Sequence, residues 1–253
     1  MLPFFRRIRK ELADDNQALK YSRYAIGEIV LVVIGILIAL QINNWNEERK
    51  DRKLELQLLK SFERSLEKDL SDMDSNIQTH QNGIRAANTI LKIFEEPGPR
   101  NIDSVSVLMS KVVMPTLFVY STSAFETLKS KGVTLISNDS LRDQIIEVYD
   151  SRYRFFINNE KIHYDNLENM LAEVFPGRFE DSYNYKINPP KFDGSMRPLD
   201  VDALADDSVF RYHLKSFRNR LVILVDWQYA ELRRRIVDLR EEILDEIKAF
   251  ESK

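Results

Sequence analysis

The sequence predicts an all-α protein in which one N-terminal transmembrane helix continues into an up-and-down bundle of long helices, a stalk that carries a distal helical head. An unbroken run of twelve apolar residues at positions 29–40 predicts the membrane helix. Long stretches with an apolar residue every three or four positions predict the bundle. The 7 glycines among 253 residues are too few for an all-β sandwich or barrel, which needs turn residues about every 8–12 positions.

Three segments follow from this pattern. Residues 1–23 form a basic arm with six Lys or Arg and three acidic residues, residues 24–45 form the transmembrane helix, and residues 46–253 form the helical bundle domain. The unbroken apolar run is short for a bilayer core of about 30 Å, which takes about 20 helical residues. The flanks supply the missing length, because Tyr24 and Trp45 fall where an interfacial aromatic belt would lie.

The flanks also decide between three interpretations of the span. A buried core helix is disfavoured because the preceding stretch is too short to form a partner domain. A cleaved signal peptide is disfavoured because the end of the span lacks a small-x-small cleavage pattern. An uncleaved signal anchor is therefore favoured. Lys and Arg near the two ends of the span do not set its orientation, but the short basic arm favours a cytoplasmic N-terminus and a periplasmic C-terminal domain.

One face of the predicted span collects residues suited to helix packing. Five positions recur at steps of four and three: Glu28, Val32, Gly35, Ala39 and Ile42. Gly35 and Ala39 form a small-x-x-x-small pair, which lets two helix backbones approach closely. We therefore expect a homo-oligomer that packs through this face. Glu28 has two interpretations, a ring of carboxylates used for proton coupling or register, or an interfacial polar residue beside a packing stripe.

The extramembrane region begins with an amphipathic stripe at residues 59–94, whose apolar spacing averages about 3.5 residues. This spacing predicts a helix, or a helix broken once near Gly83, that ends at the Pro-Gly-Pro of residues 97–99. Asn101 then caps a short helix that Pro115 limits at its far end.

The middle of the chain predicts two more helices. A helix capped by Ser121 or Thr122 is followed by a brief extended link at residues 133–136. A second helix begins at the Ser-Asn-Asp of residues 137–139. We expect residues 101–175 to form the distal head on a stalk made by the first and last helices.

The last part of the chain combines an irregular segment with a long helix. Residues 176–206 lack periodicity and contain several prolines and aromatic residues, so they predict an irregular loop draped over the helices. The final helix opens at the Asp-Asp-Ser of residues 206–208 and runs nearly to the end of the chain.

Five aromatic residues of the predicted head are candidates for a ligand pocket: Phe118, Tyr120, Tyr149, Tyr153 and Phe156. Aromatic side chains line many ligand sites, and the nearby Arg152 and Arg154 would suit an anionic small molecule. The same five residues suit the core of an aromatic-rich bundle, which is the simpler interpretation.

The composition excludes several classes of chemistry. The absence of cysteine excludes disulfides, thiolate metal sites and a cysteine nucleophile. The 37 basic and 40 acidic side chains give a formal net charge of −3, so no overall basic field attracts nucleic acid. No phosphate loop or serine elbow occurs, and His80, His163 and His213 lack metal-ligand spacing. We therefore expect no enzyme activity, cofactor, metal or nucleic-acid partner, and histidines that are exposed or on a polar stripe.

Two blocks carry a family resemblance. The patterns GE…GILIAL…INNW at residues 24–46 and LK…LISN…LR at residues 123–150 resemble a family of uncharacterised bacterial single-pass membrane proteins. The resemblance covers the whole length. It implies an N-terminal anchor, which in a bacterium places the chain in the inner membrane, and a helical extramembrane domain. It carries no assigned activity and no catalytic residue.

These observations favour a membrane-anchored, self-associating helical scaffold whose partners are the lipid bilayer and further copies of the chain. The alternative is a ligand- or partner-binding sensor module that signals through the stalk. A third, weaker alternative is an ion-coupled accessory subunit that uses Glu28 together with a membrane-protein partner.

Overall fold

The computed structural model of the chain describes residues 18–188 and 191–252. The chain divides into two compact units, Met1–Leu54 and Glu55–Lys253. Helix α2 (Ala18–Glu95) begins in the first unit and supplies the first long helix of the second. The second unit starts at Glu55, and the charged residues between the predicted boundary at residue 46 and Lys53 are all exposed.

The first unit is helical from Ala18 onward. Of the predicted basic arm, residues 1–17 lie outside the part of the chain that the structure describes. Every Ile, Leu and Val between positions 29 and 40 is exposed, with exposed fractions of 73% for Leu31 and 58% for Leu37. Among the described residues, α2 is the one helix long and apolar enough to cross a membrane, and none of its most apolar 18-residue window is buried.

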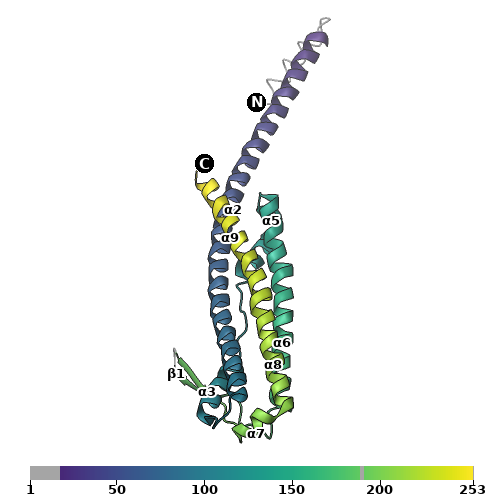
Figure 1. Cartoon of the computed structure of the whole chain (residues 1–253). Coiled ribbons are helices and arrows are strands. Elements are labelled where there is room, and N and C mark those ends of the chain that lie inside the picture. The colour runs from purple at the N-terminus through teal and green to yellow at the C-terminus, as the bar shows by residue number, and fades with distance from the viewer. Residues whose placement is uncertain (1–17, 189–190, 253) are drawn as a thin grey trace. The chain divides into compact units, whose positions relative to one another are not determined.

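The second unit is helical apart from a small hairpin and the connecting segments (Figure 1). After α2 its elements are α3 (Ile102–Val112), α4 (Ser123–Lys131), η1 (Val133–Leu135), α5 (Asp139–Ile146), η2 (Glu147–Arg152), α6 (Tyr153–Glu173), β1 (Asn184–Asn188), β2 (Lys191–Ser195), α7 (Val201–Asp206), α8 (Ser208–Ile223), η3 (Leu224–Tyr229) and α9 (Ala230–Glu251). The predicted all-α fold built on long helices is confirmed.

Three long rods make up the bundle: α2, then α5–η2–α6, then α8–η3–α9, in which η2 and η3 are π-helical turns (Figure 1). The third rod is antiparallel to α2. Lys60 Nζ lies 2.6 Å from Glu251 Oε1, and Arg233 Nε lies 2.9 Å from Asp74 Oδ1. Residue numbers therefore fall along the third rod as they rise along α2.

The second rod is parallel to α2, because Ser137 N–H donates to Glu55 at 2.6 Å and Tyr153 OH donates to Asp69 at 2.7 Å. Two consecutive parallel rods need a connection that returns along the bundle. The extended part of this connection is residues 114–122, which we call the strap. Residues 101–175 thus run along the bundle, with Ser137 beside Glu55 at one end, instead of forming a head at the far end only.

Two apolar cores fill the bundle. The first surrounds Phe62, Phe125 and Ile236, and the second surrounds Ile90 and Phe210. Both are built from the inward faces of all three rods, as a helical bundle requires.

Local sequence signals explain most element boundaries. Asn101, Asn138 and Asp207 cap α3, α5 and α8, each accepting hydrogen bonds from first-turn N–H groups, as predicted. Gly132 ends α4 with φ of 98°, a conformation that favours glycine. Thr122 makes no side-chain capping bond at the start of α4.

The structure decides between the two alternatives for the first long helix, and two other local expectations need correction. Helix α2 is unbroken at Gly83, where the missing side chain admits the end of α3: an added Cβ would lie 3.1 Å from the Lys111 carbonyl oxygen. The link predicted as extended at residues 133–136 contains the 3-10 turn η1. The predicted irregular loop at residues 176–206 contains the antiparallel hairpin β1–β2 and helix α7.

Candidate functional site

The predicted packing face of the span lies on α2 in the first unit. All five of its residues are exposed: Glu28, Val32, Gly35, Ala39 and Ile42. Apart from the adjoining backbone of α2 itself, nothing lies within 4 Å of the position that a Cβ on Gly35 would take. The face is thus not part of an apolar core. Self-association through it stays a prediction.

The five aromatic residues predicted as a pocket come together in the first core. Tyr153 is central, with ring centroids 4.3 Å from Tyr120, 5.1 Å from Tyr149 and 5.6 Å from Phe118. Phe118 in turn meets Phe156 at 5.6 Å, edge to face. Four of the rings are buried and Tyr120 is half-buried. The arrangement is that of an aromatic core, and ligand binding by these residues stays a prediction.

The strap beside these rings is held by two buried carboxylates, on Glu160 and Asp69, and by the half-buried carboxylate of Asp72. Phe118 N–H donates to Glu160 at 2.9 Å, Val119 N–H to Asp72 at 2.9 Å and Ser121 N–H to Asp69 at 2.8 Å. An extended segment inside a helical bundle has no neighbouring strand to accept its N–H groups, and buried N–H groups must be paired. The carboxylates on α2 and α6 take the place of the missing strand.

Two tyrosines complete this network. Tyr153 OH donates to Asp69 Oδ2 at 2.7 Å, and Tyr229 OH donates to Glu160 Oε1 at 2.6 Å. Burial raises the pKa of both carboxyl groups above the usual range, and the hydrogen bonds from the tyrosines partly oppose this effect. Burial also raises the pKa of both tyrosines, so each phenol keeps its proton and acts as a donor.

A polar layer separates the two apolar cores. We define it as Asn76 and His80 on α2 together with Glu160 and His163 on α6. The ring centroids of the two histidines are 5.9 Å apart, and the His163 ring stacks on Phe217 at 5.0 Å. The strap enters this layer through Thr116, whose hydroxyl donates to Asn76 Oδ1. The layer thus draws on both parallel rods and on the connection between them.

The histidines of the polar layer are neutral at neutral pH, because burial lowers the pKa of both His80 and His163 to about 4. This corrects the expectation of exposed or polar-stripe histidines for these two, although His213 on α8 is only half-buried. The adjoining cavity, bordered by Glu160 and both rings, measures about 10 Å³. Such a volume admits at most one water molecule, so the layer is too tightly packed for an organic ligand.

Sequence reasoning missed these polar residues because it followed the apolar neighbours Leu70 and Ile77. Twelve of the buried residues of α2 follow a strict alternation of four and three: Glu55, Leu59, Phe62, Leu66, Asp69, Met73, Asn76, His80, Gly83, Ala87, Ile90 and Phe94. The other buried residues of α2 flank this line: Leu58, Ser65, Ala86 and Leu91. This alternation is the seven-residue repeat of packed helices. Holding to it, and accepting polar residues at core positions, would have identified Asp69, Asn76 and His80.

Comparison with known proteins gives a family and nothing further. A protein family described as a family of unknown function (DUF6090) matches residues 28–192. No curated protein and no solved structure matches the chain. The matched part includes residues 28–45 of the predicted span, with the whole apolar run, and also the strap and the polar layer.

Proposed function

The chain belongs to this family of unknown function (DUF6090), and we propose that it is a non-enzymatic scaffold, anchored in the inner membrane by residues 24–45 and self-associating through that anchor. The observation that carries the proposal is the complete exposure of the apolar segment: none of its most apolar window is buried. Burying one Leu or Ile side chain is worth about 1.5–3 kcal/mol. An apolar helix of this length therefore needs lipid or another apolar helix around it.

The interior of the second unit supports a structural role over a catalytic one. Its buried carboxylates already accept hydrogen bonds from the strap and from two tyrosines, and its buried histidines are neutral and tightly packed. These groups hold the fold together, since the buried Glu160 and Asp69 and the half-buried Asp72 each accept a hydrogen bond from the strap.

Self-association is tested by cross-linking, because the chain lacks cysteine and any introduced cysteine is unique. Val32→Cys lies on the predicted packing face, and Leu37→Cys lies on the opposite side of the helix at about 100° per residue. The two residues are equally exposed, at 57% and 58%, so they form a matched pair. In oxidised native membranes we expect a disulfide-linked dimer from Val32→Cys and none from Leu37→Cys.

Equal cross-linking of both variants, or of neither, would contradict the proposed face. The anchor is tested separately by alkaline carbonate extraction, in which the full chain should stay with the membrane pellet. The orientation is tested with Lys68→Cys, an exposed position of the second unit. A membrane-impermeant maleimide should label it in spheroplasts without lysis if the domain is periplasmic.

A second candidate function, ligand sensing, is favoured by one observation. A cavity of about 580 Å³ lies between α2, α3 and the hairpin, within the size range of small-molecule sites. It lies away from the aromatic group that the sequence suggested.

A further inference from the structure

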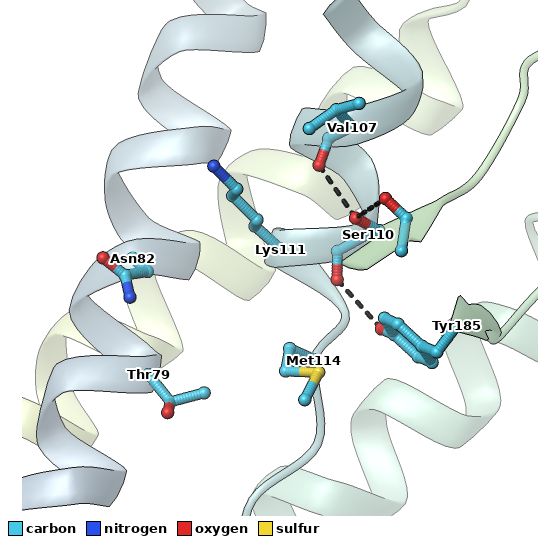
Figure 2. Close-up of a pocket in the computed structure, with 8 residues that line it drawn as sticks. Thr79, Asn82, Val107, Ser110, Lys111, Met114 and Tyr185 are labelled. Atoms are coloured by element: carbon cyan, nitrogen blue, oxygen red, sulfur yellow. Dashed lines mark hydrogen bonds between the residues drawn. The ribbon is translucent and has the colours of Figure 1, made fainter. Parts of the chain in front are cut away.

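The cavity beside α3 has walls from three separate parts of the second unit (Figure 2). Helix α2 contributes Thr79 and Asn82, α3 contributes Lys111, and β1 contributes Tyr185. Its volume of about 580 Å³ is more than fifty times that of the cavity in the polar layer. A small organic molecule fits here and not there.

The hairpin wall of this cavity is fixed in place. Tyr185 OH donates to the Ser110 carbonyl oxygen at 2.9 Å, and the Ser110 hydroxyl lies 2.7 Å from the Gly194 carbonyl oxygen (Figure 2). A side chain at Gly194 would overlap the Tyr185 ring, so glycine is needed for the ring to lie across β2. The cavity is thus built by the fold and does not depend on one mobile side chain.

Hydrogen-bond donors without acceptors gather on one side. The Asn82 carbonyl oxygen accepts from Arg85 at 2.6 Å and from Gln78 at 3.3 Å, which leaves its amide NH₂ without an acceptor among the residues the structure describes. Lys111 extends from α3 toward α2 (Figure 2), and its ammonium has no ion pair with any side chain that the structure describes. The two groups together offer N–H donors and one positive charge.

The remaining polar groups of the cavity can only accept. Thr79 donates its hydroxyl proton to the Ser75 carbonyl at 3.1 Å, and Tyr185 donates its own to Ser110 at 2.9 Å. Burial raises the pKa of Tyr185 to about 12, so the phenol stays neutral. Each hydroxyl oxygen keeps lone pairs that face a ligand donor. Val107 and Met114 add apolar surface to the cavity.

We propose that this cavity binds a small aliphatic carboxylate that also carries a hydroxyl group. The carboxylate, which only accepts, pairs with Lys111 and Asn82, and the ligand hydroxyl donates to Thr79 or Tyr185. A single lysine balances one negative charge, so a monocarboxylate suits the site better than a phosphate does. The inference goes beyond the scaffold function, and its failure would leave the anchor and its self-association unaffected.

The test measures binding to the full chain in detergent by isothermal titration calorimetry. The probes are 3-hydroxypropanoate, 4-hydroxybutanoate, 5-hydroxypentanoate and 6-hydroxyhexanoate, compared with the alkanoates that lack the hydroxyl and with inorganic phosphate. We expect at least one hydroxycarboxylate to bind more tightly than its alkanoate and than phosphate. Lys111→Met should weaken that binding about tenfold or more, because it removes a charge-assisted hydrogen bond.

Lys131→Met is the matched control, since Lys131 is an exposed lysine on α4 that does not line the cavity. Lys111 is itself exposed, so its replacement leaves the core intact, which far-UV circular dichroism verifies. The proposal is overturned if no hydroxycarboxylate binds, if phosphate binds best, or if Lys111→Met and Lys131→Met have equal affinity.

Discussion

Replacing Glu160 with alanine tests whether buried carboxylates hold the strap. Glu160 is 2% exposed and accepts hydrogen bonds from Phe118 N–H at 2.9 Å and from Tyr229 OH at 2.6 Å. Glu160→Ala leaves both donors buried without an acceptor. Each orphaned donor costs about 1–3 kcal/mol, so we expect a loss of about 4 kcal/mol in the free energy of unfolding.

For a domain of this size, about 4 kcal/mol corresponds to a fall in Tm of roughly 8–16 °C. The measurement is thermal and urea unfolding of the full chain in detergent, followed by circular dichroism. Glu160→Gln should lose only about 1 kcal/mol, because the amide oxygen still accepts from Phe118 N–H and the amide NH₂ donates to the Tyr229 oxygen.

Glu173→Ala is the control on the same helix, because Glu173 is exposed and its replacement should change stability by less than about 0.5 kcal/mol. The reasoning fails if Glu160→Ala is as stable as Glu173→Ala. In that case the backbone of the strap would have to find its acceptors elsewhere.

Two further predictions concern the polar layer and the close approach at Gly83. Below pH 6.5 the unfolded chain takes up protons that the native His80 and His163 resist, because their pKa is about 4. Stability from these residues is complete above pH 6.5 and falls as the pH drops toward 4, by roughly 2 kcal/mol per histidine at pH 5. The raised pKa of Asp69 and Glu160 acts in the opposite direction, because the native state gains stability as those groups protonate. The test therefore compares wild type with His163→Phe, which keeps the stack on Phe217: the free energy of unfolding in urea should change less between pH 7 and 5 in the variant. An equal change in both proteins would contradict the assignment. Gly83→Val should destabilise the bundle by about 1–3 kcal/mol in the same assay, since even a Cβ lies 3.1 Å from the Lys111 carbonyl oxygen; unchanged stability would show that α3 does not pack there.

Local signals predicted the fold class and several boundaries well. Helix caps such as Asn138 and Asp207 depend on side chains within three residues, so they can be identified without knowledge of the tertiary structure. The apolar span is equally local. It is recognised from length and hydropathy within one stretch of the chain, and none of its most apolar window is buried in the structure.

The strap and the polar layer were not predictable in the same way. Phe118 and Val119 have no strand beside them, and their acceptors lie 42 and 47 residues away in the sequence. Asp69 carries a charge at a core position, so a search for apolar periodicity passes over it. The hairpin is missed because its strands have five residues each and dock through Tyr185 and Gly194, a contact that only the folded chain creates.

The antiparallel return of the third rod has a practical consequence for partners. Lys60 near the start of the second unit forms an ion pair with Glu251 in the last turn of α9. The polypeptide therefore enters and leaves this unit at the same end. A protein fused after the last helix would be delivered to that same side. The opposite end of this unit, with α3 and the hairpin, is away from both of these chain connections, so a binding partner can reach it without meeting them.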